Sequence, residues 1–259
     1  MDLGISDKTA LVCASSQGLG RACATALAAE GVTIYINGRD QAKLKAAAAE
    51  IQAQTGSKVI AVVADLNTED GRAALLSACP SPDILVTNNS GPPPGKFEDW
   101  DHEDWLEGIE ANMLAPILMI KGVIIGMEER KWGRIVNITS AMVKAPFTFM
   151  GMSAGARAGL TAFSKSLARR VAKSNVTINN LLPERIDSPR QVYMAEKQAE
   201  AEGITYEQAR QKIVDGLATR RMGTMEEFGA ACAFLCSDKS GYISGQNLQL
   251  DGGTYPGVF

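Results

Sequence analysis

The chain has 259 residues, of which 46 % are hydrophobic and 21 % are charged, and its formal net charge is −3. This length fits one large α/β domain, and the composition is that of a soluble globular protein, which excludes disordered and fibrous classes. The weakly acidic balance indicates no basic surface, so nucleic acid is not an expected partner. Because His102 is the single histidine, metal sites built from several histidines are excluded.

The cysteines and the longest apolar stretch bear on where the protein resides. Five cysteines show no CxxC spacing, which predicts buried free thiols in a cytoplasmic protein. The N-terminus has no apolar run preceded by positive charge, so no signal peptide is expected. The apolar stretch over residues 113–125 contains Pro116, Lys121 and Gly122, which predicts that it is too interrupted to span a membrane.

Short apolar runs alternate with longer amphipathic segments along the whole chain. Strands are predicted over residues 9–13, 32–36, 58–63, 84–87, 134–138, 176–182 and 247–250. Helices are predicted over residues 19–30, 40–54, 68–78, 101–129, 151–172 and 224–236. Seven strands that alternate with six helices predict an α/β fold, a doubly wound, Rossmann-like parallel sheet with helices on both faces. The whole of residues 1–259 is expected to form one domain.

One segment does not fit this alternation. Residues 188–221 are highly charged and helical in composition, and they lie between a predicted strand and the next helix. Two interpretations remain open, a flap that covers a site and a solvated pair of surface helices. The first interpretation predicts a substrate lid at residues 188–221.

The first predicted strand leads into the segment Ala14-Ser15-Ser16-Gln17-Gly18-Leu19-Gly20, which opens a helix. Glycines in such a turn let the backbone approach a pyrophosphate, and the helix N-terminus stabilises its charge. Arg39 follows the second strand, where dinucleotide-binding folds place an acid for NAD or an arginine for the 2′-phosphate of NADP. The sequence therefore favours NADP(H) over NAD(H).

Several further motifs extend the pattern over nearly the whole chain. They are Asp65-Leu66 after the third strand, Asn88-Asn89-Ser90-Gly91 after the fourth, and Ser244-Gly245-Gln246 with Asp251-Gly252-Gly253 near the end. Together with the glycine-rich turn, these segments resemble the short-chain dehydrogenase/reductase family, and within it the 3-oxoacyl-(acyl carrier protein) reductase-like members. The resemblance implies an oxidoreductase that acts on a carbonyl or alcohol of a small molecule, possible substrates being of the 3-oxoacyl type. It also implies a homo-oligomer, a tetramer or a dimer.

The resemblance further assigns site residues. It implies cofactor contacts from Ala14, Ser15, Ser16, Gly18, Leu19, Gly20, Arg39, Asp65, Leu66, Asn89, Ser90, Gly91, Arg157, Pro183 and Ile186. It implies that Ser140 polarises the substrate carbonyl and that Asn112 holds a water. No metal is expected.

The sequence departs from this family at its catalytic YxxxK motif. The tyrosine lies thirteen residues beyond the catalytic serine, which falls on Ser153, and the lysine position falls on Arg157. An aliphatic hydroxyl is a far weaker acid than a phenol, and an arginine holds its proton too tightly to relay it. Because loss of a general acid costs about 10²- to 10⁴-fold in rate, the mechanism does not carry over with the fold.

Glu184 stands where the family has glycine, after Pro183, at a position that the resemblance places near the nicotinamide. It is either a substitute acid or base or a surface-loop glutamate, and the second interpretation is favoured. Tyr193 and Tyr206 of the charged insert are alternative proton donors. The first hypothesis is therefore an NADP(H)-dependent oxidoreductase with an atypical catalytic centre. The alternatives are a redox-silent nucleotide-binding sensor or scaffold, and a non-redox enzyme with Glu184 as its base.

Overall fold

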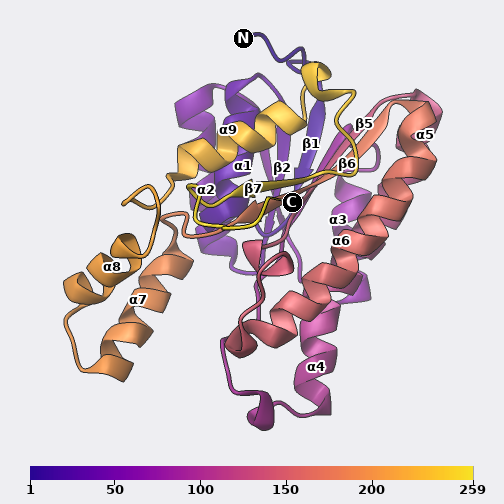
Figure 1. Cartoon of the computed structure of the whole chain (residues 1–259). Coiled ribbons are helices and arrows are strands. Elements are labelled where there is room, and N and C mark those ends of the chain that lie inside the picture. The colour runs from indigo at the N-terminus through magenta and orange to yellow at the C-terminus, as the bar shows by residue number, and fades with distance from the viewer. Residues whose placement is uncertain (259) are drawn as a thin grey trace.

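The structure is a computed structural model that describes residues 1–258. One parallel sheet forms its centre, in the order β3-β2-β1-β4-β5-β6-β7 (Figure 1). The strands are β1 Thr9–Val12, β2 Thr33–Gly38, β3 Val59–Val63, β4 Ile84–Thr87, β5 Gly133–Ile138, β6 Val176–Pro183 and β7 Asn247–Leu250. This order confirms the predicted doubly wound sheet. The winding direction reverses between β1 and β4, and ligands of such folds bind beyond the carboxyl ends of the strands at this point.

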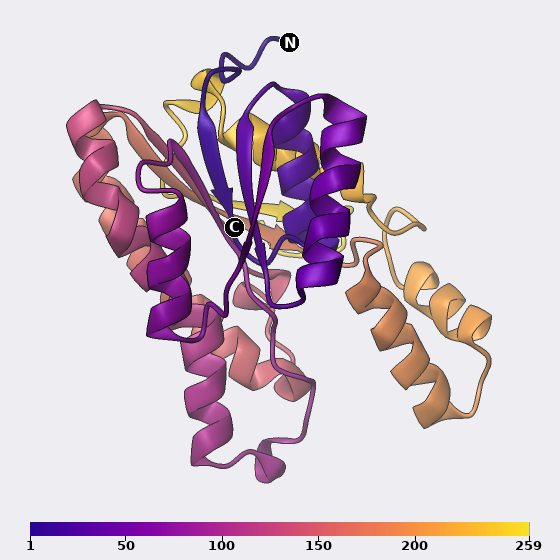
Figure 2. The same cartoon turned by 180° about the vertical axis from the view of Figure 1, so that it is seen from behind.

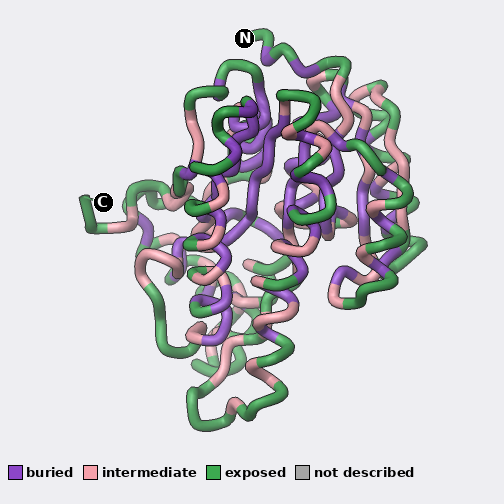
Figure 3. Tube along the Cα trace, turned by 90° about the vertical axis from the view of Figure 1, so that its right-hand side faces the viewer, coloured by how far each residue is buried: buried purple, intermediate pink, exposed green. Residues whose placement is uncertain are grey.

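Two layers of helices cover the sheet (Figures 1 and 2). The first layer consists of α1 Gly18–Ala29, α2 Gln41–Thr55 and α9 Met225–Leu235, and the second of α3 Glu69–Ala78, α5 Ala115–Arg130 and α6 Gly151–Val171. Each layer forms its own buried apolar cluster with one face of the sheet. The trace is buried through the central strands and exposed on the outer helix turns (Figure 3). All five cysteines are free and buried, as predicted.

Side-chain capping explains why two of the helices begin where they do. The Asp40 carboxylate accepts a hydrogen bond from Lys43 N at 3.0 Å and so caps α2, as the sequence predicts. The Thr68 hydroxyl accepts from Gly71 N at 3.0 Å and caps α3. Asp40 follows β2 and Thr68 follows β3, so these caps fix the loops at the carboxyl ends of those two strands.

A long helical segment crosses the outer layer. It consists of α4 His102–Ile109, a π-helical turn at Glu110–Leu114, and α5. Pro116 lacks the N–H that would bond the carbonyl of Asn112, and the π turn at this place lets the helix continue. The helix predicted over residues 101–129 is therefore confirmed, with Pro116 inside it. His102–Arg130 is long and apolar enough to cross a membrane by length and composition alone, yet half of its most apolar window is buried inside the fold.

The charged insert forms a helical hairpin at one side of the molecule (Figure 1). It contains α7 Pro189–Glu202 and α8 Tyr206–Asp215, which pack on each other through an apolar cluster of their own. A bridge between Ile186 and Gly223 joins the two chain segments that lead into and out of it. The hairpin follows the carboxyl end of β6, which places it beside the switch point.

A row of buried polar side chains, which the sequence analysis did not predict, crosses the sheet beneath this edge. Thr87 Oγ1 donates to Asn137 Oδ1 at 2.6 Å. Asn137 Nδ2 donates to Ser164 Oγ and to Asn180 Oδ1, both at 2.9 Å, and Asn180 Nδ2 reaches Asn247 at 2.8 Å. Because buried amides without partners are costly, this chain of bonds fixes the relative positions of β4, β5, β6, β7 and α6.

Candidate active site

A cavity of about 580 Å³ lies at the carboxyl edge of the sheet. Segments that follow β1 through β6 form its walls, and α7 contributes a further side. The lining includes these predicted site residues: Ala14, Ser16, Gly18, Leu19, Arg39, Asp65, Leu66, Asn89, Ser90, Gly91, Ser140, Ser153, Arg157, Pro183, Glu184 and Ile186. The structure thus brings together residues that are spread over most of the chain.

The turn between β1 and α1 is held by its backbone. Ala14 N donates to Asn37 Oδ1 at 3.2 Å, and Ala14 O accepts from Asn88 Nδ2 at 3.1 Å. Ala14 has φ +43°, in the left-handed region that favours glycine. A Cβ on Gly20 would lie 2.4 Å from Ala14 O, so only glycine fits there. The turn therefore presents the N-terminus of α1 to the cavity, as a pyrophosphate site requires.

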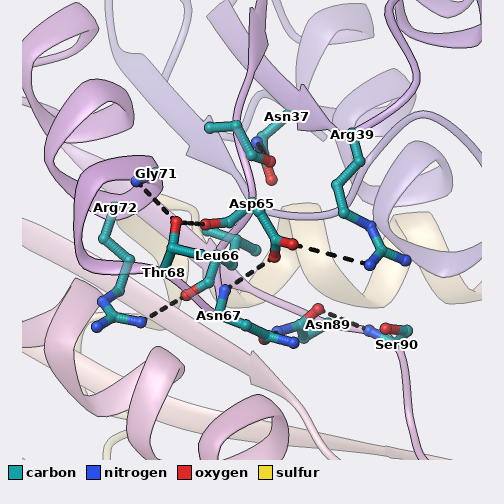
Figure 4. A network of polar contacts seen from close by, with 11 residues as sticks. Asn37, Arg39, Asp65, Leu66, Asn67, Thr68, Gly71, Arg72, Asn89 and Ser90 are labelled. Atoms are coloured by element: carbon teal, nitrogen blue, oxygen red, sulfur yellow. Dashed lines mark hydrogen bonds and ion pairs between the residues drawn. The ribbon is translucent and has the colours of Figure 1, made fainter.

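Polar groups around Asp65 form the next part of the wall (Figure 4). Asp65 Oδ1 accepts from Asn67 N at 3.0 Å, and Asn89 Nδ2 donates to Asn67 Oδ1 at 2.8 Å. The Arg39 guanidinium lies 3.8 Å from Asp65 Oδ2, and the two side chains are 67 % and 39 % exposed. Such an exposed ion pair is weak, so Arg39 is free to meet another anion. These residues and the turn after β1 fit a dinucleotide that carries a 2′-phosphate.

Three predicted site residues lie behind the wall. The fully buried Ser15 uses its hydroxyl to donate to Val12 O at 2.7 Å and to accept from Asn37 N at 3.0 Å. It therefore braces the turn and offers no side chain to a cofactor, which corrects the prediction. Gly20 and Asn112 are also absent from the lining. Asn112 Nδ2 donates to Ser90 O at 3.4 Å, while its buried Oδ1 has no hydrogen-bond partner among residues 1–258, which leaves it able to bind a water as predicted.

Ser140 follows β5 and begins a short helical turn at Ala141–Val143. Its Oγ accepts a hydrogen bond from Met142 N at 3.2 Å. This contact leaves the hydroxyl hydrogen available to the cavity, which Ser140 lines. The geometry fits a donor that polarises a carbonyl oxygen.

Ser153 and Arg157 lie on the first turns of α6 and are joined by a hydrogen bond. Arg157 Nε donates to Ser153 Oγ at 3.2 Å, and Nη1 donates to Ile138 O at 2.8 Å and Thr139 O at 3.2 Å. Burial, together with the positive charge of Arg190, lowers the pKa of Arg157 to about 10. The guanidinium therefore stays charged at neutral pH. The pair supplies a fixed cation and a weakly acidic hydroxyl, with no group that releases a proton readily.

Glu184 follows β6, and its backbone N donates to Leu250 O at 2.9 Å. Its side chain lines the main cavity and a neighbouring one of about 330 Å³, so the structure does not place it on an outer loop. Burial raises the pKa of its carboxyl group, an effect opposed by Arg185 and assisted by Asp251. A carboxyl group in this state is suited to proton transfer.

On the side of the cavity that faces α7, the sequence analysis named Tyr193 as an alternative proton donor but missed Phe147, Phe149 and Arg190. Phe147 and Phe149 stack with centroids 5.5 Å apart and 5° between their planes, and both line the cavity. Arg190 and Tyr193 of α7 line it as well. Tyr206 is absent from the lining and contacts Arg210 of its own helix at 3.4 Å. The one sequence signal for this wall is a pair of aromatic residues two apart in the loop between Ser140 and Ser153.

The described residues, 1–258, contain no group of three or more side chains that could hold a metal ion.

Comparisons with known proteins agree with this geometry. A sequence model described as enoyl-(acyl carrier protein) reductase matches residues 13–255. The chain belongs to the short-chain dehydrogenase/reductase family. This confirms the family that the motifs indicated.

Similarity to individual members of the short-chain dehydrogenase/reductase family extends over their full length. The chain is 30 % identical to the NADPH-dependent reductase BacG of Bacillus subtilis, over 98 % of this chain and 100 % of that protein. It is 30 % identical to the 3-oxoacyl-[acyl-carrier-protein] reductase FabG of Aquifex aeolicus, over 98 % and 100 %. The L-sorbose reductase of Gluconobacter frateurii, solved with NADPH and L-sorbose, has a TM-score of 0.95, 28 % identity and full coverage of both chains.

Proposed function

We propose that the protein is an NADP(H)-dependent oxidoreductase that acts on the carbonyl or alcohol group of a small molecule. The observation that carries this proposal is one cavity that joins a dinucleotide cradle, ending at Arg39, to the hydroxyl of Ser140. The names of BacG and of the sorbose reductase structure, which both include NADPH, support the cofactor.

In this proposal each end of the cofactor has its own residues. The N-terminus of α1 receives the pyrophosphate, Arg39 the 2′-phosphate, and Asp65 the adenine. Arg157 meets the ribose next to the nicotinamide, and Pro183 and Ile186 border the ring. When bound, the nicotinamide supplies or accepts a hydride.

The protein's own residues act on the substrate oxygen. Ser140 donates its free hydroxyl hydrogen to the carbonyl, and the charge of Arg157 stabilises the negative charge that develops on that oxygen. Ser153 accepts from Arg157 and is too weak an acid to protonate an alkoxide, so the alkoxide takes its proton from water. We therefore expect turnover about 10²- to 10⁴-fold slower than with a phenolic donor.

We further propose that the hairpin within residues 188–221 is a substrate lid. Arg190, Tyr193 and Met194 of α7 line the cavity, and Arg190 Nη2 donates to Pro92 O at 3.3 Å, on the loop after β4. This contact joins the hairpin to the loop after β4.

A homo-oligomer, a tetramer in the first instance, is proposed from the outer face of the long helical segment. Leu106, Leu114 and Ile125 are 51 %, 39 % and 65 % exposed there. Exposed apolar side chains that lie along one face favour contact with a second copy of the chain. Light scattering at micromolar concentration is expected to give a multiple of the 27.5 kDa chain mass, and a monomer mass would contradict the proposal. Family and composition together favour the cytoplasm.

A second candidate function rests on Glu184, whose carboxyl pKa is raised inside the cavity wall. With this group as an acid or base, the same pocket supports a non-redox reaction. This function predicts conversion of substrate without a change in NADPH, and loss of that conversion in Glu184→Gln.

The test is an assay of NADPH oxidation over a panel of 3-oxoacyl thioesters, ketoses and oxo acids. The proposal predicts consumption of NADPH equal to product formed, and a loss of about tenfold or more in Ser140→Ala. Ser81→Ala, an exposed serine away from the cavity, serves as the matched control. Binding of NADPH without any conversion would indicate a redox-silent sensor or scaffold. Conversion with NADPH unchanged would indicate the non-redox function.

A further inference from the structure

Arg157 is a partly buried cation with one donor group left over. Its Nε and Nη1 are occupied by Ser153 and two backbone carbonyl groups. Nη2 has no hydrogen-bond partner among the described residues, and a Cβ built on Gly91 would lie 3.6 Å from it. No carboxylate forms an ion pair with Arg157 within residues 1–258. A guanidinium held in this way is available to an anion from outside the chain.

Arg190 brings a second positive charge to the same cavity from α7. Its guanidinium lies 5.4 Å from the Tyr193 ring centroid, and it too has no ion pair in the described part of the chain. Nη2 bonds Pro92 O, the residue next to Gly91, so both arginines reach the same short loop. Burial is the larger cause of the lowered pKa of Arg157, and the positive charge of Arg190 adds to it. Two unpaired like charges around one cavity are unfavourable until an anion lies between them.

An apolar surface adjoins these two cations. Phe147 and Phe149 are 46 % and 45 % exposed, and their parallel rings line the same cavity. Phe149 O accepts from Gly95 N at 3.0 Å, which ties this loop to the segment that carries Pro92. Covering exposed rings with an apolar group is favourable, by about 25 cal/mol for each Å² removed from water. This surface is suited to a hydrocarbon or aromatic body.

We infer that the substrate is an oxo acid, or the corresponding hydroxy acid, with an apolar or aromatic body. Its carboxylate lies between Arg190 and one hydrogen of Arg157 Nη2, whose other hydrogen is left for the ribose, and its body lies on the Phe147–Phe149 pair. The inference rests on the proposed function and names its substrate class.

The cofactor is the other source of anions for this cavity. Its phosphates are expected at the N-terminus of α1 and at Arg39, on segments that follow β1 and β2. The carboxylate is expected at the loop after β4 and at α7. The experiment must therefore compare protein with and without cofactor.

The test is calorimetric titration of the full chain, free and with saturating NADP⁺, using 3-phenylpropanoate and 3-phenylpropanamide as probes. They have the same aromatic body, and one has a carboxylate where the other has a neutral amide. We expect the acid to bind about tenfold more tightly or better in the NADP⁺ complex, which corresponds to about 1.4 kcal/mol. Arg190→Gln is expected to remove this preference. The control Lys197→Gln, which removes one charge from an exposed position of the same helix, is expected to keep it.

A second variant tests the apolar surface. Phe149→Ala is expected to lower the affinities for the acid and for the amide by the same factor, about fivefold or more, because both probes share the ring. A loss of affinity for the acid alone would contradict the position assigned to the aromatic body of the probe.

Three outcomes would overturn the inference. They are equal affinity for the acid and the amide, an equal loss of affinity for both probes in Arg190→Gln, and displacement of the acid by saturating NADP⁺. The last result would assign the two arginines to the cofactor. Failure of NADP⁺ to bind would count against the proposed function only, because the acid and the amide are also compared on the free protein.

Discussion

The two ends of the cavity depend on different kinds of structural feature. At the cofactor end, the features that a dinucleotide needs are backbone features: a tight turn after β1, a helix N-terminus and a glycine at position 20. At the substrate end, the chemistry depends on single side chains, among them Ser153, Arg157 and Glu184, where the sequence analysis predicts a departure from the family pattern. Both ends lie on the same sheet. We therefore expect cofactor binding and proton transfer to respond to different substitutions.

The largest expected effect comes from closing the cofactor end. Gly20→Val would place side-chain atoms against Ala14 O, which already lies 2.4 Å from a Cβ built at position 20. We expect NADPH affinity to fall more than about 100-fold and stability to fall by about 1–3 kcal/mol. Fluorescence titration and urea unfolding measure the two effects. Gly241→Ala is the control, because the nearest atom to a Cβ built there, Arg134 Nη2, lies 3.5 Å away, and Gly241 does not line the cavity. Unchanged NADPH binding in Gly20→Val would show that the turn is not the cofactor cradle.

The next effect comes from restoring the family's pair at the substrate end. The double variant Ser153→Tyr with Arg157→Lys supplies a phenol whose pKa an adjacent ammonium group lowers. We expect reduction of neutral ketones to rise about 100-fold, measured as the initial rate of NADPH oxidation. Ser153→Tyr alone is the comparison, since it provides the phenol without the ammonium. A double variant no faster than the parent would mean that the rate is limited elsewhere.

A smaller effect is expected at Ala14, whose φ of +43° strains a residue with a side chain. Ala14→Gly relieves about 1–2 kcal/mol of strain and loses about 0.5–1 kcal/mol in chain entropy. We therefore expect a net gain of about 0.5–1 kcal/mol in the free energy of unfolding, seen as a higher urea midpoint. Ala29→Gly in helix α1 should instead lose about 0.5–1 kcal/mol. Destabilisation by Ala14→Gly would contradict the assigned strain.

The smallest effect concerns Glu184 and depends on pH. Burial raises the pKa of this carboxyl in the folded state, so the folded protein holds the proton to higher pH than the unfolded chain. The native protein therefore loses stability as the pH rises through the unfolded value, and is unaffected below it. We expect Glu184→Gln to match the native protein in stability near pH 4 and to be slightly more stable than the native protein at pH 7. Melting temperatures of the two proteins at the two pH values test this. A stability gain of Glu184→Gln that is larger at pH 4 than at pH 7 would contradict the raised pKa.

Much of the cofactor end could be predicted from the sequence, because its signals are local. A strand, a glycine-rich turn and a helix follow one another within some twenty residues, and Arg39 comes directly after the next strand. Ser15 is the exception. Its burial depends on a bond to Asn37 on the neighbouring strand, which the local pattern does not contain.

The substrate end was predicted less completely, because its walls come from distant segments. The stacked Phe147 and Phe149 meet the loop after β4, and Arg190 arrives from a hairpin that the sequence showed only as charged and helical. The π turn before Pro116 and the buried row around Asn137 likewise depend on contacts across the fold. Spacing within the sequence could locate the replaced residues Ser153 and Arg157, but not what now surrounds them.

The most direct test of the central claim, that the cofactor end is intact and specific, is a fluorescence titration of the purified protein with NADPH and NADH. We expect NADPH to bind about tenfold more tightly or better, and Arg39→Ala to remove most of that difference, because a charge-assisted contact with a phosphate is worth about 1.5–3 kcal/mol. Lys45→Ala, at an exposed position on the neighbouring helix, should leave the difference unchanged. Absence of binding by both nucleotides, or tighter binding of NADH, would contradict the account.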